Sequence, residues 1–81
     1  MSTLVDRVES ASYTDGFVTI LMDSGLEHRF PVAGNPRLRK GSAEQLGKIT
    51  ITPFGIHWPD LDEDLSLRGI QAGDFGQERK V

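Results

Sequence analysis

The stretch TDGFVTILMDSGLEHRFPV, residues 14–32, decides the fold of this chain. It contains two turn signals, Asp15-Gly16 and residues 23–25, and Asp-Gly favours a tight hairpin because both residues tolerate positive φ. Residues 17–23, between the two turns, are apolar on both faces, which is typical of a central strand. The stretch therefore predicts a central strand that is joined by a tight turn to a strand on each side.

The segments on either side supply the two outer strands of a meander. Residues 4–13 carry β-branched and aromatic residues without helical spacing, and they predict the first strand. After the second turn, Leu26, His28 and Phe30 alternate with charged residues, which is the period of a half-buried strand. Pro31 ends this strand because it has no N–H to donate.

Two short helices are predicted next, each from its capping residues. Asn35 before Pro36 places an N-cap ahead of a proline at the first helical position. Ser42 and Gln45 have the spacing of a capping box, in which each side chain bonds to the backbone of the other residue. Helices this short gain their stability by docking on the sheet.

A second hairpin and a last helix complete the predicted order of elements. Residues 48–52 and 56–58 alternate on either side of a turn at Pro53–Gly55. Ser66 and Gly73 mark the start and the end of a final short helix. The sequence thus predicts an α+β fold, a two-layer sandwich in which helices cover one face of an antiparallel sheet (β-meander, helix, β-hairpin, short helix).

Length, charge and residue usage exclude several classes of protein. The 81 residues predict a single small domain, 1–81, with a polar, frayed tail at 74–81. The chain has no cysteine, so disulfides and thiolate metal sites are excluded, and we expect no cofactor. The net charge of −3 argues against direct binding of a nucleic-acid backbone. No apolar run approaches the roughly 20 residues of a membrane span, so we expect a cytoplasmic protein without membrane contact.

The segment GIHWPDLDEDLS, residues 55–66, raises the question of a binding site, because four carboxylates fall within residues 60–64. The alternate aspartates resemble the start of an EF-hand loop, but Leu65 and Gln71 occupy the positions that need glycine and a bidentate glutamate. In the structural interpretation, Trp58 fills the core and its N–H meets a carboxylate. The acidic residues are then the solvated edge that precedes a helix, and they interact favourably with its positive end.

A catalytic interpretation of the same segment stays open as the alternative. In it, His57, Asp60, Asp62 and Asp64 form the site of a small metal-dependent hydrolase. A transition-metal site needs about three convergent protein ligands, so a site of this kind has to recruit His28 from another strand.

The basic cluster Arg37, Arg39 and Lys40 is the one positive patch in the sequence. Three charges within four positions beside a helix start can contact phosphate or an acidic protein surface, and they are our candidates for partner binding. The alternative is that these side chains are simply solvated.

Several stretches resemble a bacterial family of small domains of unknown function. They are GIHWPDLDEDLS at 55–66, the following LRGIQAG at 67–73, the segment Asn35–Gln45, and DSGLEHRFPV at 23–32. The resemblance implies an α+β two-layer sandwich and no established enzyme activity. Members of that family are found fused ahead of a helix-turn-helix domain or encoded beside a second small protein, as in toxin–antitoxin pairs. The family supplies no catalytic residues to carry over.

Taken together, these features predict a non-catalytic protein-interaction or regulatory module, and the resemblance implies that it is bacterial. The resemblance adds the hypothesis that the chain is one half of a toxin–antitoxin-like pair. We expect a protein partner or a homo-oligomer, with open edge strands as the docking surface.

Overall fold

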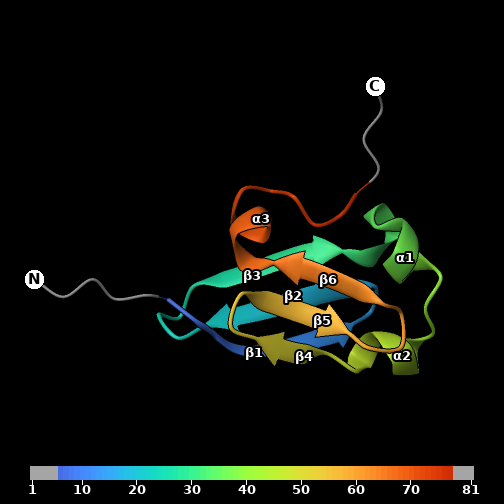
Figure 1. Cartoon of the computed structure of the whole chain (residues 1–81), viewed down its shortest axis with the longest axis horizontal. Helices are drawn as coiled ribbons and strands as arrows, with labels where there is room; N and C mark the ends of the chain where they lie inside the picture. The colour runs from blue at the N-terminus through green and yellow to red at the C-terminus, as the bar shows by residue number, and fades with distance from the viewer. Residues whose placement is uncertain (1–5, 78–81) are drawn as a thin grey trace, which may run out of the picture.

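Two three-stranded antiparallel sheets form the body of the protein in a computed structural model that describes residues 6–77. The strand order is β1-β2-β3 in one sheet and β4-β5-β6 in the other, so each sheet is a meander (Figure 1). The strands are β1 Val8–Thr14, β2 Phe17–Met22, β3 Glu27–Pro31, β4 Thr50–Thr52, β5 Gly55–Trp58 and β6 Glu63–Ser66; the helices are the 3₁₀ helix η1 Val32–Gly34, α1 Pro36–Arg39, α2 Ala43–Gly47 and α3 Leu67–Gln71.

The first sheet confirms the predicted meander. Asp15 and Gly16 join β1 to β2 with φ of 49° and 88°, the left-handed values that this turn requires. In β2, alternate residues are fully buried on one face, while the other face is only partly covered. In β3, Phe30 is buried, whereas Leu26 precedes the strand and is 53% exposed.

The second sheet contains a strand that the sequence analysis missed. Glu63 to Ser66 form β6, which pairs antiparallel with β5, and Leu65 lies opposite the buried Ile56. The acidic run precedes α3 as predicted, but it forms a turn and an edge strand, and no acidic residue lies in the first turn of that helix. Asp and Glu are depleted in strands, so local propensity opposed the pairing that β5 and the burial of Leu65 impose.

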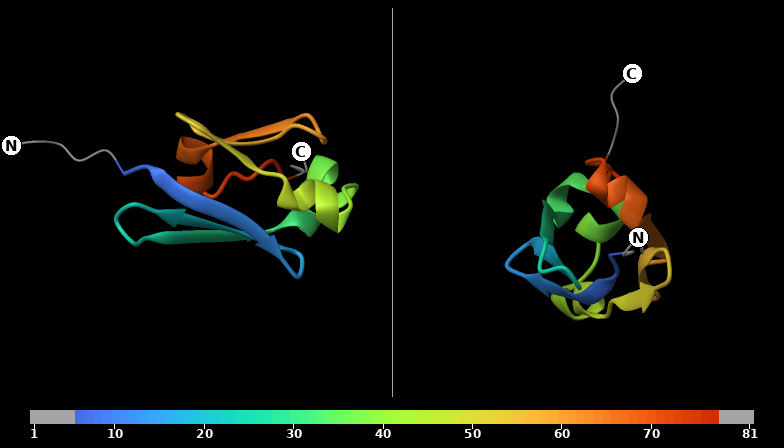
Figure 2. Two further views of the ribbon diagram at one scale, coloured as in Figure 1. Left: turned by 90° about the horizontal axis from the view of Figure 1, so that it is seen from below. Right: turned by 90° about the vertical axis from the view of Figure 1, so that its left-hand side faces the viewer.

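The two sheets face each other and enclose the core between them (Figure 2). The α+β class and the antiparallel sandwich are confirmed, but the second layer is a sheet with short helices rather than helices alone. Side chains from both sheets and all three α-helices meet in one cluster, and Trp58 is its largest fully buried member. The cluster consists of Val18, Ile20, Met22, Phe30, Val32, Leu38, Leu46, Ile56, Trp58, Leu65 and Ile70.

The helix caps form as their sequence patterns predict. The Asn35 side chain accepts hydrogen bonds at the start of α1, and Ser42 and Gln45 make the complete capping box of α2. Ser66 Oγ accepts from Gly69 N at the start of α3. Helices α1 and α2 lie at one end of the sandwich, away from the start of β1 (Figure 1). No helix within residues 6–77 is long and apolar enough to cross a membrane.

The predicted tail at 74–81 lies only partly within the described residues. The Phe75 ring stacks on Phe30, with 5.1 Å between ring centroids and an interplanar angle of 15°. The Phe75 carbonyl also accepts a hydrogen bond from the Asn35 side chain. Residues 74–77 are thus packed against the body of the protein, and 78–81 lie outside the described residues, as do residues 4 and 5 of the predicted first strand.

Candidate functional site: an apolar groove at the open end of the sandwich

The four residues of the proposed hydrolase site are divided between separate contacts. His57 Nδ1 and Asp64 Oδ1 lie 2.7 Å apart, as cross-strand neighbours on β5 and β6. Asp60 instead lies 3.4 Å from Lys48, and Asp62 occupies the β5–β6 turn with a φ of 51°. The structure therefore brings together two of the four candidates.

No metal site forms from these side chains in the part of the chain that the structure describes. Within residues 6–77 there is no group of three or more His, Cys, Asp or Glu side chains that could hold an ion. His28, which a transition-metal site has to recruit, lies on β3 in the other sheet, opposite Ile20. Its Nε2 atom is buried and has no hydrogen-bond partner among the described residues.

Trp58 has the structural role that the sequence predicts, but with a different hydrogen-bond partner. Its side chain is fully buried, and its indole N–H donates to the carbonyl of Leu46 at 3.0 Å. The prediction that a carboxylate accepts this hydrogen bond is wrong. The bond instead ties the end of α2 to β5, so the indole joins a helix to the second sheet.

One acidic residue of the run, Glu63, helps to hold the fold together through a hydrogen bond. Glu63 Oε2 accepts a hydrogen bond of 2.9 Å from the Nδ2 of the fully buried Asn35. The same Nδ2 donates to the Phe75 carbonyl at 2.8 Å, while the Asn35 Oδ1 accepts from the backbone of Arg37 and Leu38. Asn35 thus joins α1, β6 and the C-terminal segment through a single satisfied side chain.

The basic cluster is partly used within the fold. Arg37 Nη1 donates to the Asp62 carbonyl at 3.1 Å, and Arg39 Nη1 approaches the Ala33 carbonyl at 3.5 Å. Lys40 is exposed at the end of α1. Two of the three predicted partner-binding residues therefore orient α1 against its neighbours.

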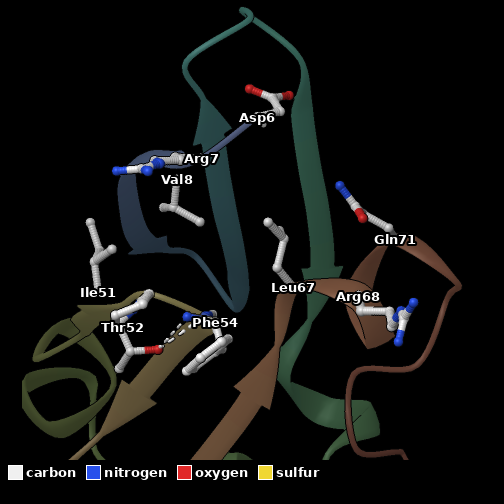
Figure 3. A pocket seen from close by; sticks show the side chains of 11 residues that line it. Asp6, Arg7, Val8, Ile51, Thr52, Phe54, Leu67, Arg68 and Gln71 are labelled. Atoms are coloured by element: carbon white, nitrogen blue, oxygen red, sulfur yellow. Dashed lines mark hydrogen bonds between the residues drawn. The ribbon is translucent and has the colours of Figure 1, made fainter. Parts of the chain in front are cut away.

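A depression on the described surface lies at the other end of the sandwich from α1 and α2 (Figure 3). It is an open groove of about 770 Å³, within the range of roughly 300–1,000 Å³ typical of binding sites. We call it the open-end groove. The start of β1, the β4–β5 hairpin and α3 form its walls, with the lining residues Asp6, Arg7, Val8, Ile51, Thr52, Pro53, Phe54, Gly55, Leu67, Arg68 and Gln71.

The floor of the open-end groove continues the core of the sandwich. Ile51 pairs directly with Ile56, so both side chains point to the same face of the sheet. Ile56 is only 1% exposed, whereas Ile51 is 44% exposed. Val8 and Leu67 are half-buried and pack against the core at the same end. Residues with core-facing positions are therefore exposed here, because no other described element covers this end.

The β4–β5 turn holds Phe54 at the rim of the groove. The Thr52 Oγ1 accepts from the backbone N–H groups of Phe54 and Gly55, and the Phe54 carbonyl accepts from Leu67 N at 2.7 Å. Gly55 is required because a Cβ there would overlap the backbone of Leu65 and Leu67. The backbone of Phe54 is thus fixed on both sides, yet its side chain is 82% exposed.

Two guanidinium groups flank this apolar surface. Arg7 lies on the β1 side and Arg68 on the α3 side, with Leu67 between them (Figure 3). Neither side chain forms an ion pair within residues 6–77. Asp6 also lines the groove, but both of its carboxylate oxygens accept hydrogen bonds from Ser24, at 2.9 and 2.6 Å. The lining therefore carries two guanidinium charges and one carboxylate charge in a chain whose net charge is −3.

Sequence reasoning missed the open-end groove because it treated Pro53–Gly55 only as a turn. The signal that could have found it is Phe54 itself, an aromatic residue at the tip of a hairpin where polar residues are usual. Nothing in the sequence indicated that Ile51 would be exposed, because it alternates in phase with Ile49 as a buried residue does. Its exposure depends on where the second sheet ends.

Comparisons with known proteins agree with this fold. Residues 8–76 match the profile of a family described as "Protein of unknown function (DUF2442)". A protein of unknown function from Rhodospirillum rubrum is 33% identical, with a TM-score of 0.80 over 93% of this chain and 95% of that chain. An uncharacterised protein from Chromobacterium violaceum is 27% identical, with a TM-score of 0.76 over 88% of this chain and 69% of that one. No curated protein matches the chain. Because the profile covers most of the sequence, the chain belongs to the DUF2442 family of proteins of unknown function.

Proposed function

We propose that this protein is a non-catalytic interaction module that docks a polypeptide partner in the open-end groove. The observation that carries the proposal is Phe54, whose backbone is held from both sides while its ring is 82% exposed. Phenylalanine, like tyrosine and tryptophan, is enriched at protein–protein interfaces relative to the rest of the protein surface. A rigid turn also lowers the entropy lost on binding.

The energetic argument compares what Phe54 contributes to folding with what it offers to a partner. An exposed side chain adds little to stability, so Phe54→Ala should change the free energy of unfolding by no more than about 0.5 kcal/mol. Full burial of a phenylalanine in an interface is worth about 1.5–3 kcal/mol, which is roughly a 10- to 150-fold change in affinity. Phe54 therefore stabilises a complex much more than it stabilises the free fold.

Size-exclusion chromatography with light scattering tests the proposal. The chain is measured alone and with the product of the adjacent gene, and we expect either a hetero-complex or a homo-oligomer. Phe54→Ala should weaken that complex by roughly 10- to 150-fold in affinity. Phe17→Ala is the matched control, because Phe17 is also exposed but lies at the far end of β1–β2. A strict monomer that ignores its neighbour, or a complex whose affinity Phe54→Ala leaves unchanged, contradicts the proposal.

A further inference from the structure

We propose that the open-end groove is an interface between two copies of this chain, in which each copy inserts Phe54 into the groove of the other. This inference rests on the proposed function and names the partner as a second copy, which contributes a residue to the site. Three features of the described residues support it: an exposed aromatic ring, an apolar depression directly beside that ring, and an area that fits a small symmetric interface.

The exposed ring is held on a fixed turn. Phe54 lies in the β4–β5 turn, and its side chain is more exposed than any other large apolar side chain within residues 6–77. Its backbone N–H donates to Thr52 Oγ1 at 3.3 Å, and its carbonyl accepts from Leu67 N at 2.7 Å. The backbone that carries the ring is therefore ordered before any partner binds, which reduces the entropy that association costs.

The depression that can receive such a ring lies beside Phe54 (Figure 3). Val8, Ile51 and Leu67 contribute apolar side chains to its lining, and Ile51 is still 44% exposed in the free chain. The volume of about 770 Å³ leaves room for a phenylalanine side chain and part of the turn that carries it. Because the phenylalanine ring has no polar atom, it can enter this apolar surface without leaving a buried donor or acceptor of its own unpaired.

The position of the ring next to the groove selects a second copy as the occupant. In a two-fold dimer, residue i of one copy contacts residue j of the other, and residue j contacts residue i in return. A surface that presents a projecting side chain beside a matching depression is therefore self-complementary, since one rotation places both Phe54 rings in the two grooves at once. The charged side chains of the lining, Asp6, Arg7 and Arg68, include both signs, so they do not present a uniformly charged surface to the second copy.

The area of the interface indicates how tightly the two copies bind. A buried phenylalanine covers roughly 150–250 Å², so the two rings, each 82% exposed in the free chain, remove roughly 250–400 Å² from water. A standard interface buries about 1,200–2,000 Å² from roughly 20–30 residues a side, more residues than line this groove. We therefore expect a reversible dimer with a dissociation constant of about 10 μM to 1 mM.

Sedimentation equilibrium of the full-length chain, at concentrations up to about 1 mM, tests the inference. We expect a monomer–dimer equilibrium that Phe54→Ala weakens by at least about 100-fold, because each dimer loses two rings and each ring is worth about tenfold or more. Phe17→Ala should leave the equilibrium unchanged, since Phe17 is exposed at the far end of β1–β2.

A mixing experiment tests whether the copies exchange Phe54. Phe54→Ala keeps the groove but lacks the ring, whereas Ile51→Glu keeps the ring but places a carboxylate in the groove. Amide chemical shifts of labelled Phe54→Ala should change at residues 6–8 and 67–71 when unlabelled Ile51→Glu is added, and should not change when unlabelled Phe54→Ala is added. Thr50→Glu is the control for Ile51→Glu, because Thr50 precedes Ile51 on β4 but faces the other side of the sheet, so it should dimerise like the unmodified chain.

Several outcomes would overturn the inference. It is wrong if the unmodified chain stays monomeric up to about 1 mM, if Phe54→Ala and Phe17→Ala weaken the dimer equally, or if the mixture causes no shift changes at the groove. If circular dichroism shows that Ile51→Glu does not fold, the unlabelled unmodified chain takes its place in the mixture and should cause the same shift changes. A monomer that binds the product of the adjacent gene through Phe54 leaves the proposed function standing with a different partner, whereas a chain that forms neither complex contradicts both proposals.

Discussion

Asn35 should contribute more to stability than any other polar side chain of the described fold. Its Oδ1 caps α1 by accepting from the backbone of Arg37 and Leu38, and its Nδ2 donates to Glu63 and to the Phe75 carbonyl. Because the side chain is fully buried, its removal leaves partners that water cannot easily reach. The lost cap costs about 1 kcal/mol, and the unpaired buried partners cost about 1–3 kcal/mol.

We therefore expect Asn35→Ala to lower the free energy of unfolding by about 2–4 kcal/mol, out of a total of about 4–12 kcal/mol for a domain of this length. Asn35→Ser separates the two contributions, since serine is a good N-cap but is too short to reach both distant acceptors. It should cost about 1–3 kcal/mol. The control is Ser42→Ala, which removes only an exposed cap and should cost about 1 kcal/mol.

Urea unfolding measures these differences when it is followed by both Trp58 fluorescence and far-ultraviolet circular dichroism, with coincident transitions as the check of two-state behaviour. The cost of Asn35→Ala should exceed that of Asn35→Ser by about the cost of Ser42→Ala. The reasoning is refuted if Asn35→Ser unfolds within about 0.5 kcal/mol of the unmodified chain, because the bonds to Glu63 and Phe75 then contribute nothing.

Four further tests address other parts of the structure, the variants by urea unfolding (followed by circular dichroism alone for Trp58→Ala, which lacks the only tryptophan) and the metals by thermal melting. Trp58→Ala should cost about 3–5 kcal/mol, the usual range for emptying an aromatic core position, and a loss below about 1 kcal/mol contradicts its burial. Gly55→Ala should destabilise the fold by more than about 2 kcal/mol because the new Cβ meets the β6 backbone, whereas Gly47→Ala, with open space around it, should be neutral or slightly stabilising. His28→Phe should leave stability unchanged or raise it by up to about 2 kcal/mol, since it removes a buried Nε2 that has no partner among the described residues; a large loss would show that this atom has one. Zinc, manganese and calcium should leave the melting temperature unchanged, and a stabilisation that His57→Ala abolishes would favour the hydrolase alternative.

The features predicted correctly from sequence depend on short-range contacts. The turn at Asp15-Gly16, the caps at Asn35, Ser42 and Ser66, and the inward alternation of Ile56 and Trp58 all follow from residues within about four positions of one another. Sterics and local hydrogen bonds determine such features wherever the chain later packs. That is why the meander, the short helices and the position of the tryptophan were all predictable.

The acidic run shows where local information is insufficient. Its composition favours a turn or a helix start, but Leu65 is buried opposite Ile56, and the pairing with β5 makes a strand of residues 63–66. The partner of the Trp58 N–H was also mispredicted, because the Leu46 carbonyl comes within reach only when α2 packs against β5. In both cases the structure is determined by contacts with residues that are distant in sequence, which local patterns do not show.

The sequence by itself therefore determined the elements and their buried faces, and the tertiary structure decided which of those faces remain uncovered. The local sequence pattern around Ile51 is that of a core residue, and the pattern around Phe54 predicts only a turn. Both line the open-end groove only because no other described element covers the end where β1 begins, while α1 and α2 occupy the other end. Burial is a property of surfaces brought together from distant parts of the chain, so no local pattern encodes it completely.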